Sequence, residues 1–173
     1  RDIAVNDDLE YLKKSYGIND TKYWNIAEAK MHISKDEVEK KISEYVFRPF
    51  DIRWVYYEPN IIERGDARWN LMRHLLESNL SLLSMRGIRE EEFNHFFVCD
   101  KLVSKDAVSI KDNCFVFPLY LYPDTQNEQG NLLTKKDVNF SETFLKTIRQ
   151  KLGYSPTPEA IFYYIYAIFH SPT

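Results

Sequence analysis

The chain has 173 residues, of which 44% are hydrophobic and 28% are charged, and its formal net charge is −3. This length suits one well-cored domain with a small helical appendage, and the composition is that of a globular protein rather than a disordered tail. The longest apolar run, residues 160–169, is about half of the roughly 20 residues that a membrane-spanning helix requires, so we expect no membrane partner.

The N-terminal region, residues 6–44, is expected to be a helical lead-in. Apolar residues recur at helical spacing over residues 9–16, and Gly17 then provides a natural helix stop. Thr21 is expected to cap a second helix that covers residues 24–27.

A capping box predicts a third helix in this region. Ser34 and Glu37 have the spacing at which each side chain satisfies the backbone N–H group of the other residue. The helix that follows would hold Val38, Ile42 and Tyr45 on one apolar side.

Alternating and apolar runs in the rest of the chain predict the strands of a sheet. The first two runs lie on either side of a turn that contains Pro49. The last run is too apolar on both faces for a surface strand, so we expect it inside the sheet, with Pro118 at a bulge or an unpaired position. The predicted strands are 45–48, 52–57, 79–85, 93–99 and 115–122.

Three further helices and one loop complete the predicted elements. Asp66 can cap the first of these helices, Ser141 begins the second, which Gly153 ends, and Thr157 caps the third ahead of a proline. Residues 124–136 are polar and are predicted to form an exposed loop. The prediction is therefore an α+β fold, with a central mixed or antiparallel sheet flanked by helices and a helical N-terminal lead-in.

Patterns for catalysis are weak in this sequence. The triplets 28–30 and 39–41 match only the last part of an Asp…Glu-x-Lys nuclease motif, and both fall in predicted helices rather than on a strand. The Asn/Asp-Pro-Pro-aromatic tetrapeptide of adenine methyltransferases and a glycine-rich phosphate loop are both missing. We therefore expect no catalytic residue and no cofactor in this chain.

Histidine and cysteine do not predict a metal site. Cys99 and Cys114 have no zinc-binding spacing and are expected to be free thiols in a reduced, cytoplasmic setting. The histidines are scattered over different elements, so each is expected to be an ordinary core-edge or surface residue. They are His32, His74, His95 and His170.

Arginine is concentrated in the middle of the chain. No lysine occurs between Lys41 and Lys101, yet seven of the nine arginines lie there. The planar guanidinium can donate two hydrogen bonds to a phosphate or to the edge of a guanine base. An equally weighted alternative is that several of them form buried ion pairs with carboxylates such as Asp51 or Glu90. The seven are Arg48, Arg53, Arg64, Arg68, Arg73, Arg86 and Arg89.

The segment 47–57, with the sequence FRPFDIRWVYY, resembles the RPFDxRWxYY motif of type ISP restriction-modification enzymes and their type IIG-like relatives. These enzymes are single polypeptides with a fused adenine-N6 DNA methyltransferase. Further blocks follow in the family's order and extend the resemblance over residues 45–172. They are 72–76 with 79–80, 93–98, 117–123 and 158–172.

In that family these blocks form the C-terminal specificity region. The resemblance therefore implies recognition of duplex DNA by residues 45–173, with residues 1–44 as a lead-in or linker from the methyltransferase side of the same parent chain. It also implies that the region continues beyond this chain, and that the parent methylates adenine and cleaves DNA through other domains. Those domains would use S-adenosylmethionine and Mg²⁺ as cofactors. The resemblance does not decide whether they also use ATP. Where relatives often read Glu-Arg-Pro-Arg, this chain has residues 63–66 as Glu-Arg-Gly-Asp, so the recognised bases stay unpredicted.

The candidate DNA contacts are cationic and polar side chains in turns or at the ends of predicted elements. A first group of arginines is followed by weaker candidates, whereas Arg48, Arg53 and Arg73 are expected to be structural. Two other roles stay open: a protein-interaction module that packs on the methyltransferase core, and a stand-alone nuclease. The candidate contacts are Arg64, Arg68, Arg86 and Arg89, then Asn94, His95, Lys101 and Lys105.

Overall fold

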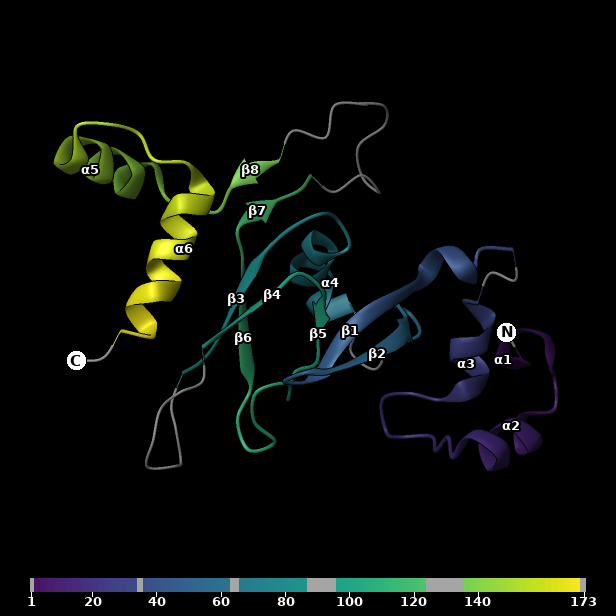
Figure 1. The fold of residues 1–173 in the computed structure, drawn as a ribbon. Helices are drawn as coiled ribbons and strands as arrows, with labels where there is room; N and C mark the ends of the chain where they lie inside the picture. The colour runs from purple at the N-terminus through teal and green to yellow at the C-terminus, as the bar shows by residue number, and fades with distance from the viewer. Residues whose placement is uncertain (1, 34–35, 63–65, 87–95, 124–135, 172–173) are drawn as a thin grey trace. The chain divides into compact units, whose positions relative to one another are not determined.

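The computed structural model describes residues 2–33, 36–62, 66–86, 96–123 and 136–171 (Figure 1). Its helices and its small mixed and antiparallel sheets confirm the predicted α+β class. The chain forms two compact units, one of residues 1–45 with 53–70 and the other of residues 46–52 with 71–173. The predicted domain boundary after residue 44 stays a prediction. No helix in the described ranges is long and apolar enough to cross a membrane.

The first unit begins with three short helices. The side chain of Asp8 accepts a hydrogen bond from the backbone N–H of Tyr11, and Gly17 ends the second helix in a left-handed conformation, with φ of 63°. Leu12 and Ile26 are buried in the core of this unit. The helices are α1 (Asp2–Val5), α2 (Leu9–Tyr16) and α3 (Ile26–Met31).

Two predictions for this region were wrong. Helix α3 is capped by Asn25, whose side-chain oxygen accepts from the Glu28 N–H at 2.8 Å, because Thr21 instead pairs with Trp24 in an isolated β-bridge. Ser34 lies outside the described residues, and over residues 36–45 the predicted third helix is reduced to a single 3₁₀ turn, η1 (Glu39–Lys41). A β-branched and aromatic run follows this turn and forms a strand, so strand pairing overrides the capping box.

The two strands predicted around Pro49 are confirmed as β1 (Ile42–Arg48) and β2 (Asp51–Tyr56). They belong to a three-stranded sheet of order β2-β1-β5, in which β5 is Leu102–Val103. At the turn, Phe50 has a φ of 64°, a conformation that is unusual for a bulky residue, and its side chain is 96% exposed.

The second unit is built on an antiparallel sheet of order β4-β3-β6 (Figure 1). Helix α4 (Asp66–Met72) and the 3₁₀ helix η2 (Arg73–Leu75) lead into this sheet. A two-stranded ladder and two helices complete the unit. The strands are β3 (Ser81–Met85), β4 (Phe97–Cys99), β6 (Cys114–Pro118), β7 (Tyr120–Leu121) and β8 (Asp137–Val138), and the helices are α5 (Glu142–Leu152) and α6 (Pro158–Phe169).

The expectation of one interior strand over residues 115–122 was wrong. This segment divides into β6 and β7, and β6 is an edge strand among the strands described. Phe115 and Phe117 are 40% and 51% exposed, although the apolar pattern predicted burial. Proline has no N–H to donate and is confined to edges and bulges, so Pro118 already indicated an edge position.

Both C-terminal helices have the predicted caps. Ser141 accepts a hydrogen bond from the Phe144 N–H, and Thr157 accepts one from the Ala160 N–H, each at 3.2 Å. Gly153 ends α5 with a φ of 73°. Nearly all of the loop predicted before α5, from residue 124 to residue 135, lies outside the described residues.

A buried carboxamide joins β3 to β7. The Asn79 side chain donates to the carbonyl of Tyr120 at 2.8 Å and accepts from the N–H of the same residue at 3.1 Å, as a paired backbone would. It also donates to the carbonyl of His74 at 3.0 Å and accepts from the N–H of Leu80 at 2.9 Å. Asn79 is only 7% exposed, so water cannot replace these bonds.

We expect Asn79→Ala to lower the free energy of unfolding by about 2–4 kcal/mol, because it leaves several buried backbone groups without partners. Chemical denaturation of the variant would measure this loss. The exposed Asn113 offers a matched control, and Asn113→Ala should change the stability by less than about 0.5 kcal/mol. Equal stability of the two variants would contradict a structural role for this carboxamide.

Candidate nucleic-acid interface

One face of the β4-β3-β6 sheet combines exposed aromatic side chains with a cation. The register places Val98 and Phe117 on either side of Leu82, and Phe115 opposite Ser84, so these side chains share a face. Leu82 packs against the buried cluster around Phe162, whereas the two phenylalanines of β6 remain substantially exposed. This face therefore offers flat apolar surface at the edge of the sheet.

Arg86 lies at the end of β3, directly after Met85, and is exposed. Its guanidinium carbon lies 6.0 Å from the centre of the Phe115 ring, near the outer limit of a cation–π contact. A guanidinium that contacts an aromatic ring keeps the N–H groups at its edges available for a ligand. Arg86 can therefore donate two parallel hydrogen bonds to a phosphate or a base edge.

Lys105 lies at the same end of the sheet. Met85 pairs with Cys114, and the Cys114 N–H donates to the Lys105 carbonyl at 2.8 Å. The Lys105 ammonium lies 3.9 Å from the Asp106 carboxylate, and both side chains are exposed. An ion pair of this kind in water contributes little, so it does not prevent Lys105 from binding a phosphate.

Two other predicted contacts lie elsewhere. Lys101 follows Cys99, which pairs with Ser81 at the opposite end of β3, and its ammonium lies 3.4 Å from Asp100. Arg68 is half-buried on α4, in the first unit. The remaining four, Arg64, Arg89, Asn94 and His95, lie outside the described residues.

The arginines expected to be structural differ among themselves. Arg73 donates to the Tyr122 carbonyl at 2.5 Å, and its Nε is buried. Arg48 donates to the Phe47 carbonyl at 2.7 Å, with its guanidinium carbon 4.3 Å from the Phe47 ring centre. Arg53 is exposed on β2.

Burial shifts the pKa values of three groups near the sheet, His74, Cys99 and Cys114, toward their neutral forms. Desolvation, assisted by the positive charge of Arg73, lowers the pKa of His74, whose Nδ1 accepts from the Tyr122 N–H at 2.9 Å. Burial raises the pKa of the Cys99 thiol, and it raises that of Cys114 to about 11. Neutral thiols are poor nucleophiles and poor metal ligands. Within the described ranges, no three His, Cys, Asp or Glu side chains gather as a metal site.

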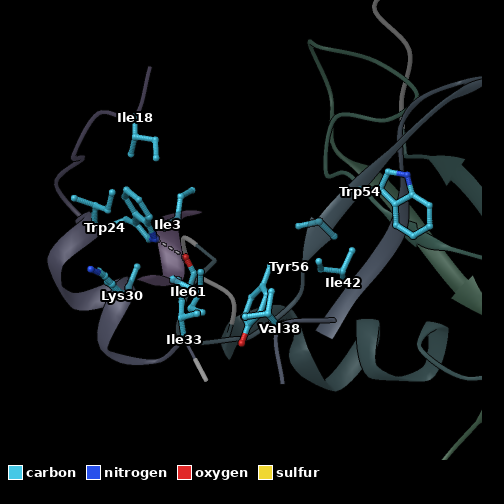
Figure 2. A pocket seen from close by; sticks show the side chains of 14 residues that line it. Ile3, Ile18, Trp24, Lys30, Ile33, Val38, Ile42, Trp54, Tyr56 and Ile61 are labelled. Carbon is cyan, nitrogen blue, oxygen red and sulfur yellow. Dashed lines mark hydrogen bonds between the residues drawn. The ribbon is translucent and has the colours of Figure 1, made fainter. Parts of the chain in front are cut away.

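The first unit contains an apolar cavity of about 280 Å³ (Figure 2). Its walls include Trp24, Ile33 and Ile61, and the Trp24 indole N–H donates to the Ile61 carbonyl. The one charged lining residue, Lys30, already binds the Asp7 carboxylate at 2.5 Å. Tyr56 also lines the cavity, and its buried hydroxyl has no hydrogen-bond partner in the described part of the chain. The charged group of the cavity is already paired, so the sheet end with Arg86 is the better candidate for binding a nucleic acid.

The chain matches a known protein family. A family model described as "Type ISP C-terminal specificity domain" matches residues 2–173. Among solved structures, the chain is similar to one in "cryoEM structure DrdV-DNA complex", with a TM-score of 0.60 and 24% identity. The similarity covers 99% of this chain and 16% of that chain. A comparison with curated proteins finds no match.

The lowered pKa of His74 predicts a pH dependence of stability. Below the ordinary value of about 6.5 the unfolded chain binds a proton that folded His74 does not, so stability falls as the pH drops from about 6.5 to the folded pKa. Denaturation curves at several pH values should show a shallower fall for His74→Gln than for the wild type. The exposed His32 provides the control, and a His74→Gln curve identical to that of His32→Gln would contradict the prediction.

Proposed function

The chain belongs to the type ISP C-terminal specificity domain family, and we propose that it recognises a short duplex DNA sequence through the sheet end that carries Arg86. The similar solved chain comes from a complex with DNA, and its fold matches 99% of the present chain. Because this chain spans only 16% of that one, the bond-making steps are assigned to other parts of a longer protein.

The exposure and chemistry of Arg86 carry the proposal. It is an exposed arginine against an aromatic ring at the start of the connection from β3 to β4. That connection, residues 87–95, contains three of the predicted contacts, Arg89, Asn94 and His95. Arginine contacts guanine through O6 and N7, and asparagine contacts adenine through N6 and N7, so this composition suits the reading of base edges.

The net charge of the chain fits a protein in which this domain reads bases and other domains supply most phosphate contacts. A chain with a net charge of −3 does not supply a large basic surface for non-specific attraction to DNA. A few well-placed cations can still read a sequence while other domains contribute phosphate contacts. We assign adenine methylation and cleavage to those domains, with S-adenosylmethionine and Mg²⁺ as their cofactors and ATP left open.

A second candidate function is packing against the methyltransferase domain of the parent chain. It is favoured by exposed apolar side chains on α6, among them Tyr164 and Ile168, which lie one helical turn apart. Contiguous exposed apolar surface commonly marks a protein contact. The two functions are compatible, because Arg86 and α6 are different parts of the unit.

We expect Arg86→Ala to weaken binding to a selected duplex by about 1–3 kcal/mol and to relax selection at one base pair. Selection from a randomised duplex pool would identify the preferred sequence, and fluorescence anisotropy at several salt concentrations would measure affinity. Arg86→Lys should keep the salt dependence but lose base discrimination, since lysine lacks the planar fork.

Lys22 is a suitable control, because it is also an exposed cation over an aromatic ring, 5.3 Å from the centre of Tyr23. Lys22→Ala should bind DNA as the wild type does. Wild-type affinity and unchanged sequence preference in Arg86→Ala would contradict the assignment of this arginine. Absence of duplex binding by the wild-type protein, even at low salt, would contradict the proposed function itself.

A further inference from the structure

Helix α5 carries three cationic side chains that are exposed. Lys146, Arg149 and Lys151 form no ion pair within the described part of the chain, although Glu142 lies one turn before Lys146. Counting these four residues, the helix has a net charge of +2 in a chain whose net charge is −3. The helix is therefore a local concentration of positive charge.

Many described cations in other elements have a partner. Several lysines are paired with carboxylates, as Lys13 is with Asp20 at 2.6 Å. Others lie over aromatic rings, as Lys136 does at 3.7 Å from the centre of Tyr120. Against this background the unpaired cations of α5 indicate a surface that is complementary to an external anion.

The polar side chains of α5 form a stripe of defined chemistry. Lys146, Arg149 and Gln150 have the i, i+3, i+4 spacing that places side chains next to one another on one face of a helix. Arginine and glutamine are the side chains that make bidentate contacts with guanine and adenine, respectively. Lysine acts as a point charge that suits a phosphate.

The face of α5 opposite the stripe is apolar, and both ends of the helix are capped. Phe144, which is 38% exposed, packs against Phe140 with ring centres 5.5 Å apart, and Ile148 is half-buried. The Ser141 cap fixes the first turn, and the Gly153 N–H closes the last turn on the Arg149 carbonyl at 3.0 Å. The caps therefore stabilise the helical conformation that brings the stripe residues together, although no residue of the helix is buried.

Stabilisation of the helix dipole is the structural alternative. Cations in the last turn interact favourably with the free carbonyl groups there, which accounts for Arg149 and Lys151. It does not account for Lys146 in the middle of the helix or for Gln150, which carries no charge. The helix dipole therefore does not explain why Lys146 and Gln150 are part of the stripe.

We propose that α5 is a second DNA-contact element, with Arg149 and Gln150 directed to base edges in the major groove and Lys146 to a phosphate. A helix with its side chains is about 10–12 Å across, which matches a major groove about 12 Å wide. The proposal rests on the proposed function, since it adds a contact surface to DNA recognition. It assigns to α5 a role separate from that of Arg86.

The test uses the same randomised duplex pool and the selected duplex. Arg149→Ala and Gln150→Ala should each weaken binding about ten- to a hundredfold and relax selection at particular base pairs. Arg149→Lys should retain the salt dependence and lose the selectivity. Lys146→Ala should weaken binding to all sequences alike and reduce the slope of affinity against salt by about 1.

The matched control is Lys14, an exposed lysine in the last turn of α2, which also ends at a left-handed glycine. If the α5 cations only stabilise their helix, Arg149→Ala will change stability as Lys14→Ala does and leave DNA selection unaltered, which overturns the inference. Selective loss in Arg86→Ala with normal selection in the α5 variants overturns the inference and leaves the proposed function standing. A wild-type protein that binds no duplex overturns both.

Discussion

The pairing of the Asn79 carboxamide with the backbone of Tyr120 is the interaction on which the second unit depends. It fixes the start of β3 to β7, where the Tyr120 hydroxyl donates in turn to the Glu159 carboxylate in the first turn of α6. Arg73 and His74 add bonds to the neighbouring Tyr122 backbone. One polar network thus connects the sheet that ends at Arg86 with helix α6. Much of the motif-like sequence around residues 72–80 is explained by this structural task.

Local chemistry made several elements predictable. Helix α2 with Gly17, the strands around Pro49 and the caps of α5 and α6 all follow from side-chain-to-backbone bonds or turn residues that lie within a few positions of one another. The predictions were wrong where pairing between strands that are distant in the sequence determines the structure. The capping box at Ser34 could not reveal that Ile42 would enter a strand, and the apolar pattern of β6 could not reveal that this strand has one described neighbour.

The candidate site was predictable in part and for similar reasons. Position in a turn or at the end of an element, which made Arg86 a candidate, is a local property, and the structure has Arg86 exposed at the end of β3. Arg86 and Lys105 lie at the same end of the sheet because Met85 pairs with Cys114. Local sequence patterns do not predict this register. The stripe on α5 was readable as a spacing of Lys146, Arg149 and Gln150.

The two units are interleaved along the chain. Residues 46–52 belong with residues 71–173, whereas residues 53–70 belong with the N-terminal segment. The backbone therefore passes from one unit to the other three times, along β1, along β2 and within α4. A single recombination event between relatives therefore cannot exchange one unit alone: a junction after residue 70, for example, transfers the whole first unit together with residues 46–52 of the second. A chimera designed to transfer the complete second unit alone, with both the sheet end and α5, needs a splice at each of the three passages.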